Sequence, residues 1–173
     1  MAGPVFIIGY MGSGKTTVGK KLAGMLGYKF VDMDALIAEM VGEPIPQIFR
    51  NKGEAAFREL ERSVLHSLVR RSNTVVSTGG GAPCFFDNMK LMNDAGITVY
   101  LNMQVKSLIA RLQKSKQERP LLPPMPDYEL EQYISAHLSG RLPFYNMAQL
   151  VIKGENADLD HLVKSIRDIY STL

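Results

Sequence analysis

The sequence predicts an α/β fold in which a five-stranded parallel sheet is flanked by helices. Short apolar runs bounded by glycine alternate along the chain with segments whose apolar residues recur at helical spacing. Alternating strands and helices form parallel βαβ units, which place helices on both faces of a buried sheet. The length of 173 residues suits one domain. We therefore expect a single α/β domain over residues 1–173.

The N-terminal third is expected to hold two strand–helix units. Residues 5–8 are uniformly apolar and predict a buried strand, and a glycine-rich turn leads from them to a helix over 15–26. That helix is expected to stop at Gly27, because glycine commonly ends helices. A second strand over 29–32 and a short helix over 35–41 follow, and this helix also ends at a glycine.

The middle of the chain continues the alternation. Residues 54–71 predict a long amphipathic helix with a single apolar face. An apolar run over 74–78 predicts the third strand, which stops at three successive glycines. A helix over 86–95, a strand over 97–101 and a helix over 105–114 complete this part of the pattern.

The C-terminal part begins with a break in regularity. Four prolines lie within residues 115–127 and disfavour both helix and sheet, so this polar connection favours a mobile lid over a plain surface loop, which is the alternative. A helix over 128–138, a fifth strand over 150–153 and a closing helix over 159–170 follow.

Composition excludes several classes of protein. The chain has 20 Lys and Arg against 17 Asp and Glu, so its net charge of +3 is far below that of a protein held on nucleic acid by phosphate contacts. The single cysteine, Cys84, excludes a disulfide scaffold and a cysteine-based zinc cluster and fits a reducing compartment. No apolar run approaches the roughly 18 residues of a membrane-spanning helix. We expect a cytoplasmic monomer without nucleic-acid or membrane partners.

Residues 9–16 match the phosphate-binding pattern G-x-x-x-x-G-K-[ST] in full. A predicted strand enters the motif and a predicted helix leaves it, which argues against the alternative of a glycine turn with a chance lysine. Gly9, Gly12 and Gly14 allow successive backbone N–H groups to face an anion. Lys15 supplies a positive charge to the β- and γ-phosphates, and the Thr16 hydroxyl is a ligand for Mg²⁺. The motif predicts a P-loop fold that binds a nucleoside triphosphate.

Two carboxylates near the end of the second strand narrow the class of P-loop protein. The third strand has no acidic residue at its end, and Asn51-Lys52-Gly53-Glu54 fails the last position of the guanine signature of GTPases. Acidic residues instead lie at the end of the second strand, where strand alternation predicts that Asp32 and Asp34 point to the same side of the sheet. Both are expected at the carboxyl edge, where ligands bind in open α/β sheets. They suit anchoring of Mg²⁺ and orientation of an acceptor hydroxyl. The alternative for Asp34 is an N-cap of the helix that follows.

Three further features are candidates for binding an anionic acceptor. Arg58 and Glu61 are three residues apart on the long helix, where they form either a solvated ion pair or a guanidinium held ready for a carboxylate. Gly79-Gly80-Gly81 allow a ligand close to the main chain. Within the proline-rich segment, Arg119 is a candidate for an arginine finger over the transferred phosphoryl group.

These residues together resemble the shikimate kinase family over essentially the whole chain. Six motifs occur in the family's order and approximate spacing: the P-loop, Asp32-Met33-Asp34, Phe57-Arg58-Glu59 with Glu61, Gly79-Gly80-Gly81, Arg119-Pro120-Leu121-Leu122, and Arg141-Leu142-Pro143-Phe144-Tyr145 with Ala148. The resemblance implies a P-loop kinase of the nucleoside-monophosphate-kinase type with a mobile lid. It implies transfer of the γ-phosphoryl group of ATP to the 3-hydroxyl of shikimate, with Mg²⁺ as cofactor, in aromatic amino acid biosynthesis.

The resemblance also implies roles for individual residues. It assigns catalysis to Asp34, Lys15 and Arg119, and the metal to Thr16 and Asp32. It places the acceptor region at about residues 34–60 and the lid at about 113–127. The implied acceptor contacts are Asp34, Arg58, Gly79, Gly80, Gly81 and Arg141. The implied ATP contacts are Gly12, Ser13, Gly14, Lys15, Thr16, Thr17, Arg111, which stacks near adenine, and Arg119.

Two alternatives stay open at the level of sequence. Another small P-loop kinase, acting on gluconate or a nucleotide, would share the phosphate-binding loop of residues 9–16 and the general fold. A non-catalytic ATP-binding module would share this loop but has no use for a lid arginine and two carboxylates at a strand end. One departure from the family pattern is the segment Lys153-Gly154-Glu155-Asn156, which differs from the usual adenine loop.

Overall fold

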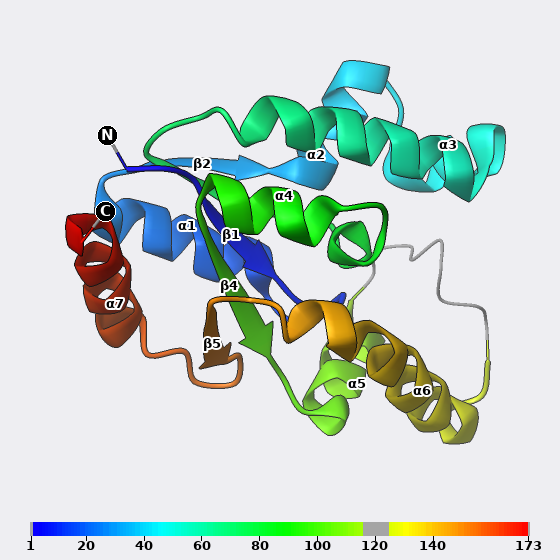
Figure 1. Ribbon diagram of the computed structural model, residues 1–173. Coiled ribbons are helices and arrows are strands. Elements are labelled where there is room, and N and C mark those ends of the chain that lie inside the picture. Colours follow the sequence, from blue (N-terminus) through cyan, green and yellow to red (C-terminus); the bar gives the residue numbers. More distant parts are fainter. Residues whose placement is uncertain (1, 116–124, 173) are drawn as a thin grey trace.

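A computed structural model describes residues 2–115 and 125–172, and it contains a five-stranded sheet with helices on both faces (Figure 1). All strand pairs are parallel and the order is β2-β3-β1-β4-β5. The strands are β1 (Val5–Ile8), β2 (Lys29–Asp32), β3 (Thr74–Ser77), β4 (Ile97–Asn102) and β5 (Leu150–Lys153). The predicted five-stranded parallel sheet is confirmed.

The helices follow the predicted order, with one additional short turn. They are α1 (Lys15–Leu26), α2 (Met33–Val41), α3 (Ile45–Leu68), the 3₁₀ turn η1 (Ala82–Cys84), α4 (Asn88–Ala95), α5 (Val105–Lys114), α6 (Asp127–Tyr145) and α7 (Leu159–Thr172). The bounds predicted for α1 and α5 are confirmed. Gly27 ends α1 in the left-handed conformation, with φ of 72°, and its N–H donates to carbonyls of the last turn.

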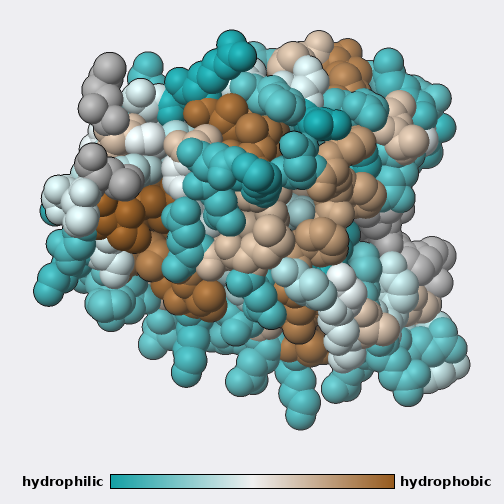
Figure 2. Space-filling view, viewed as in Figure 1, coloured by the Kyte–Doolittle hydropathy of each residue, from teal (hydrophilic) through white to brown (hydrophobic). Residues whose placement is uncertain are grey.

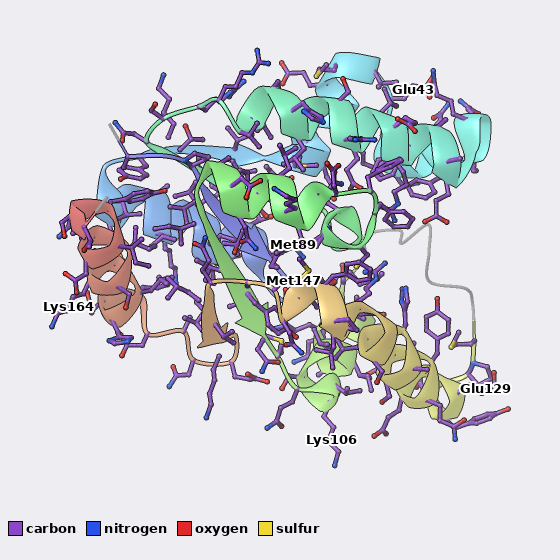
Figure 3. The ribbon with its side chains drawn as sticks, viewed as in Figure 1. Glu43, Met89, Lys106, Glu129, Met147 and Lys164 are labelled. Atoms are coloured by element: carbon purple, nitrogen blue, oxygen red, sulfur yellow. The ribbon has the colours of Figure 1, made fainter. Side chains whose placement is uncertain are left out.

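Each face of the sheet has its own apolar core, because successive residues of a strand point to opposite faces. Val5 and Ile7 of β1 pack with α1 and α7, which lie together on one side of the sheet in Figure 1. Phe6 and Ile8 pack on the opposite face with side chains from α2 to α6. The polar sides of the helices point away from the sheet, as Lys106, Glu129 and Lys164 show in Figure 3.

Several element bounds differ from the prediction. β3 ends at Ser77 rather than at 78, β4 at Asn102 rather than at 101, and α7 at Thr172 rather than at 170. Helix α2 begins at Met33 rather than at residue 35, because the carboxylate of Asp32 caps it by accepting the N–H of Ala35 at 3.1 Å. Helix α4 begins at Asn88 rather than at 86, after the unpredicted turn η1. The remaining two differences, in α3 and α6, are larger.

Helix α3 contains an unpredicted first segment. It begins at Ile45 instead of residue 54, is interrupted at Gly53, whose φ of 80° is not helical, and ends at Leu68 instead of 71. Pro44 and Pro46 lie at the start of this segment, where proline fits a helix because the first N–H groups need no partner. The predicted start at residue 54 is therefore the start of the second segment only.

Helix α6 runs seven residues beyond its predicted end, through Gly140 and Pro143 to Tyr145. Both residues disfavour a helix interior, so the sequence gives no local signal for this continuation. The buried side chains of Arg141 and Tyr145 keep the last turns against the body of the protein. Tertiary contacts thus outweigh the local preference.

The exterior is mainly polar. In Figure 2 most of the visible surface is hydrophilic, and hydrophobic residues appear on it in separate patches. Within residues 2–115 and 125–172, no helix has both the length and the apolar character needed to pass through a bilayer.

Candidate active site

The motif at residues 9–16 forms a loop between β1 and α1 at the carboxyl edge of the sheet. Gly12 and Gly14 have φ of 77° and 91°, values that favour glycine, so the sequence pattern has a direct conformational cause. Helix α1 begins at Lys15, which directs its first N–H groups into the loop. The ammonium of Lys15 is buried and donates to the carbonyls of Gly9 and Tyr10, each at 2.9 Å. The result is a concave site for an anion.

A cavity of about 840 Å³ opens from this loop. Of the residues predicted to bind ATP, those that line it are Gly12, Gly14, Lys15, Thr16, Thr17 and Arg111. Ser13 is almost completely buried inside the loop, and its hydroxyl has no hydrogen-bond partner among the described residues. The predicted Arg119 lies outside the described residues, as does most of the predicted lid.

Arg111 of α5 lies directly over the loop. A Cβ atom on Gly14 would be only 2.7 Å from Nη1 of Arg111, so the guanidinium and the loop backbone are in close contact. The absence of a side chain at Gly14 leaves room for this approach. The arrangement places the positive charge of Arg111 in the lining of the large cavity, beside the phosphate-binding loop.

Thr16 and Asp32 are in direct contact beside the loop. The Thr16 hydroxyl donates to Oδ2 of Asp32 at 2.6 Å, while Oδ1 of Asp32 caps α2. A hydroxyl and a carboxylate are hard oxygen donors of the kind that Mg²⁺ takes from a protein while it keeps several waters. Within the described part of the chain no cluster of three or more His, Cys, Asp or Glu could hold a metal. These two residues fit Mg²⁺ bound mainly by water and phosphate.

Asp34 lies in the first turn of α2, and the hypothesis that it is the N-cap of that helix is wrong because Asp32 is the cap. The strand alternation used to pair Asp32 with Asp34 does not apply either, since the strand ends at Asp32. Both carboxylates nevertheless line the large cavity, because the first helical turn keeps Asp34 at the carboxyl edge of the sheet.

A second, smaller cavity of about 90 Å³ adjoins the first. The two share four lining residues, Met11, Asp34, Ile45 and Gly80. The other residues around the small cavity are Phe49, Phe57, Arg58, Glu61, Gly79, Gly81 and Arg141. All six residues predicted to bind the acceptor therefore surround one cavity, although they come from four separate segments of the chain.

Arg58 and Glu61 form a buried ion pair, so the interpretation as a solvated surface pair is wrong. Nη1 of Arg58 is 2.8 Å from Oε1 of Glu61, and the two residues are only 4% and 1% exposed. Glu54, one turn earlier, accepts from Nη2 of Arg58 at 3.1 Å. The ring of Phe85 covers the guanidinium at 4.1 Å. Arg58 is thereby fixed at the wall of the small cavity.

The second carboxylate oxygen of Glu61 faces Asp34. A Cβ on Gly79 would be 2.8 Å from Oε2 of Glu61 and 2.9 Å from Oδ1 of Asp34, so both oxygens lie beside the same glycine. Oε2 of Glu61 is buried and has no hydrogen-bond partner among the described residues. Burial raises the pKa of Glu61 to about 7, against the opposing effect of Arg58 and with a smaller contribution from the negative charge of Asp34.

The three glycines after β3 line the small cavity with their main chain. A Cβ on Gly81 would be 2.5 Å from Nη2 of Arg58, so the guanidinium occupies the space that a side chain would need. Gly80 is held by Tyr145, whose hydroxyl donates to its carbonyl at 2.6 Å. The glycine loop is thus fixed between α3 on one side and α6 on the other.

Arg141 of α6 completes the wall of the small cavity. It is 6% exposed, and its Nη1 has no hydrogen-bond partner among the described residues. The same Nη1 is 3.4 Å from the position that a Cβ on Gly80 would take. A buried guanidinium nitrogen with spare hydrogen-bonding capacity is a suitable donor for an anionic ligand.

Sequence reasoning missed some residues of this site. Ile45 and Phe49 line the small cavity from the unpredicted first segment of α3. Their spacing of four residues after Pro44 is a helical signal that could have found them. Glu54, the second partner of Arg58, is also visible in the sequence as an i, i+4 neighbour.

Comparisons with known proteins agree with this site. The family model "Shikimate kinase" matches residues 11–170. A shikimate kinase of Parabacteroides distasonis is 47% identical over 151 residues, which cover 87% of each chain. The crystal structure of a shikimate kinase from Bacteroides thetaiotaomicron superposes with a TM-score of 0.87 at 41% identity, covering 97% of this chain and 98% of the other.

A second solved structure, a shikimate kinase from Acinetobacter baumannii in complex with shikimate, gives a TM-score of 0.86 at 35% identity. It covers 99% of this chain and 94% of that one. Sequence and fold thus agree over nearly the whole length, and the predicted resemblance is confirmed. The chain belongs to the shikimate kinase family.

Proposed function

We propose that the chain transfers the γ-phosphoryl group of ATP to the 3-hydroxyl of shikimate, giving shikimate 3-phosphate and ADP. Membership of the shikimate kinase family supports this reaction. The observation that carries it in the structure is the position of Asp34, which lines both the nucleotide-sized cavity and the small cavity. One carboxylate at the boundary of two cavities is suited to act on a group that passes between them.

The large cavity is proposed to hold ATP. The loop N–H groups and the ammonium of Lys15 contact its phosphates, and Arg111 lies where it can cover the base or the phosphates. Thr16 and Asp32 are the proposed ligands of Mg²⁺, which supplies neutralisation of phosphate charge when bound. The remaining proposed contacts are Gly12, Ser13, Gly14 and Thr17.

The small cavity is proposed to hold shikimate, a small carboxylic acid with ring hydroxyls. Arg58 and Arg141 offer guanidinium groups to the carboxylate, and both are positioned by buried contacts before any ligand arrives. The backbone of Gly79, Gly80 and Gly81 allows close approach of the ring. The rings of Phe49 and Phe57, 4.5 Å apart, form an apolar wall.

The proposed reaction needs positioning, charge neutralisation and removal of one proton. The acceptor oxygen forms a bond to the γ-phosphorus, the bond from that phosphorus to the bridging oxygen of ADP breaks, and the hydroxyl proton passes to Asp34. Holding both substrates in line accounts for much of the acceleration in phosphoryl transfer. Lys15, whose ammonium is held by the carbonyls of Gly9 and Tyr10, stabilises the developing charge on the phosphates.

Three further parts of the proposal rest on sequence alone. Arg119 is the proposed arginine finger within a lid over about 113–127, and the acceptor region spans about 34–60 of a single domain. The chain is proposed to act as a cytoplasmic monomer on two small molecules, which fits its single cysteine.

The test is an assay of ADP release with and without shikimate. ADP release is expected to depend on shikimate, and Asp34→Asn is expected to lower kcat by about 10²- to 10³-fold while the affinity for ATP stays near that of the wild type. Glu39→Gln, an exposed change on the same helix, is the matched control. Unchanged turnover in Asp34→Asn would remove this residue from the mechanism.

A panel of acceptors separates the proposal from its alternatives. Gluconate and nucleoside monophosphates should give turnover far below that of shikimate, because an open-chain acid does not present its hydroxyls as a ring does and a nucleotide is too large for a cavity of about 90 Å³. ATP binding without any shikimate-dependent ADP release would instead favour a non-catalytic module.

A further inference from the structure

One face of α6 contacts both the phosphate-binding loop and the small cavity. His137, Arg141 and Tyr145 are spaced by four residues and therefore lie along the same side of the helix. Tyr145 holds the carbonyl of Gly80, and Arg141 lines the small cavity. Nδ1 of His137 is 2.8 Å from the hydroxyl of Tyr10, which belongs to the phosphate-binding loop. The proposed function gives a role to Arg141 but none to His137 or Tyr10.

Tyr10 links the loop to α6 through both of its ends. Its carbonyl accepts a hydrogen bond from Lys15 at 2.9 Å, while its side chain is 1% exposed and reaches α6. The guanidinium carbon of Arg141 lies 5.4 Å from the centre of the Tyr10 ring. The residue that supports the phosphate-binding lysine therefore also supports the guanidinium of the neighbouring cavity.

We propose that the hydrogen bond between Tyr10 and His137 positions Arg141 for the carboxylate of the acceptor. Tyr10 and His137 are positioning residues, since neither lines the small cavity. The inference rests on the proposed function in one respect, which is that the acceptor carries a carboxylate. It adds that acceptor affinity is set partly by a contact between the phosphate-binding loop and α6.

The geometry gives this contact its importance. Arg141 is a long side chain whose Nη1 has no partner among the described residues, so ion pairing does not fix that nitrogen before the acceptor binds. The location of the guanidinium depends instead on the Tyr10 ring 5.4 Å away, on the neighbouring Tyr145, and on the rotation and position of α6 along its axis. A hydrogen bond one helical turn away, on the same face, fixes both.

The protonation states favour a hydrogen bond from tyrosine to histidine. Burial raises the pKa of Tyr10 to about 12, so its hydroxyl keeps its proton at neutral pH. Burial and the nearby charge of Arg141 lower the pKa of His137, and Glu54 opposes this only partly. In its Nε2–H tautomer the neutral imidazole accepts the tyrosine proton at Nδ1, and the rings of Tyr133 and Tyr10 pack against it.

The experiment uses Tyr10→Phe in the full chain, because this change removes one oxygen and keeps the ring under Arg141. We expect the KM for shikimate to rise about three- to ten-fold, the range of one lost hydrogen bond, with kcat and the KM for ATP within two-fold of wild type. Calorimetry of shikimate binding should show the same loss of affinity. A KM for shikimate within two-fold of wild type would overturn the proposal, and so would an equal rise in the KM for ATP.

Tyr170→Phe is the matched control. Its hydroxyl donates to the carbonyl of Pro4 at 2.9 Å in a half-buried position at the opposite edge of the sheet. It loses the same oxygen and a hydrogen bond of similar length, so it reports the effect of stability alone. A rise in the KM for shikimate as large as that of Tyr10→Phe would show that general loosening is responsible, which contradicts a positioning role.

A second variant tests the other partner. His137→Leu should raise the KM for shikimate by a similar factor, and the double variant Tyr10→Phe with His137→Leu should add little to either. If the rise in the KM for shikimate in the double variant were instead the product of the two single rises, the two residues would act independently, which would contradict a shared contact. These outcomes are separate from the proposed function, because that fails only if the wild-type protein does not turn over shikimate.

Discussion

The phosphate-binding loop lies next to the acceptor cavity, which is the small cavity proposed to hold shikimate, but the two are built in different ways. The loop is a single run of eight residues whose working groups are mainly backbone N–H groups made available by glycine conformations. The acceptor cavity is lined by residues of α2, α3 and α6, by the glycines after β3 and by Met11 of the phosphate-binding loop itself. Its volume of about 90 Å³ is roughly a tenth of that of the nucleotide-sized cavity.

This difference decides what each region depends on. Backbone donors are fixed by the local path of the chain and need few particular side chains. The acceptor cavity depends more on side chains, because it contains the buried guanidinium groups of Arg58 and Arg141 beside the carboxyl group of Glu61. A buried charge is costly unless it is paired, and Arg58 is paired with Glu61 and Glu54, so a single substitution in this network should disturb the cavity although it is remote from the phosphates.

The largest expected effect comes from the only buried side-chain charge of the phosphate-binding loop. Lys15→Met should lower kcat by about 10³-fold, because it removes the charge that stabilises the phosphates and releases the carbonyls of Gly9 and Tyr10. Steady-state kinetics measures this, and Lys21→Met, an exposed change on the same helix, is the control. A loss in kcat below tenfold would mean that the backbone N–H groups of the loop are sufficient to stabilise the phosphates.

The next effect separates the two regions by substrate. Arg58→Met should raise the KM for shikimate by about 10²-fold and leave the KM for ATP nearly unchanged, since two charge-assisted hydrogen bonds are lost in one cavity only. The protein should stay folded, because Glu61 can take up a proton when its partner is removed. Arg62→Met, one turn along on the outer side of α3, is the control. Equal effects on both KM values would contradict a separate acceptor cavity.

A pH effect of intermediate size tests the buried carboxylate. The pKa of Glu61 is raised in the folded state, so its contribution to stability is complete at low pH and is lost as pH rises through about 7. Relative to Glu61→Gln, the wild type should lose roughly 2 kcal/mol of unfolding free energy between pH 5 and 8. Urea unfolding at both pH values measures this, with the exposed Glu59→Gln as control. A constant difference between the proteins would contradict the raised pKa.

The smallest expected effect concerns the space beside Gly79. Gly79→Ala places a methyl group 2.8 Å from Glu61 and 2.9 Å from Asp34, and both carboxylates must move. Because the ends of these side chains can shift, we expect a rise of about tenfold in the KM for shikimate rather than loss of folding. Gly140→Ala, where an added Cβ meets nothing within 4 Å, should leave it unchanged. No change in Gly79→Ala would show that the ring does not approach this glycine.

The same contrast explains what the sequence could and could not predict. The loop was predictable because its glycines, lysine and threonine are contiguous and each has a local conformational or chemical reason. The three central strands β3, β1 and β4 were predictable from apolar runs that are buried on both faces of the sheet. Helix ends controlled by tertiary contacts were not, as the continuation of α6 through Pro143 shows.

The environment of the acceptor cavity lay beyond sequence reasoning. Helical spacing pairs Arg58 with Glu61 but does not say that both are buried, since that depends on the covering ring of Phe85 and on the glycine loop. The closeness of Asp34 to Glu61 depends on strand order, which places β2 beside β3. The contact between Tyr10 and His137 joins residues 127 positions apart and has no local signal.

The two oxygens of Asp32 have a consequence for how mutational data on this fold should be interpreted. One oxygen starts the helix that carries Asp34, and the other meets Thr16. If both proposed roles hold, Asp32→Ala would disturb cation affinity and the placement of Asp34, the proposed base, together, and kinetics alone would attribute both defects to the metal. Asparagine at this position keeps an oxygen for the helix start, so comparing the two replacements is the way to assign each defect to its origin.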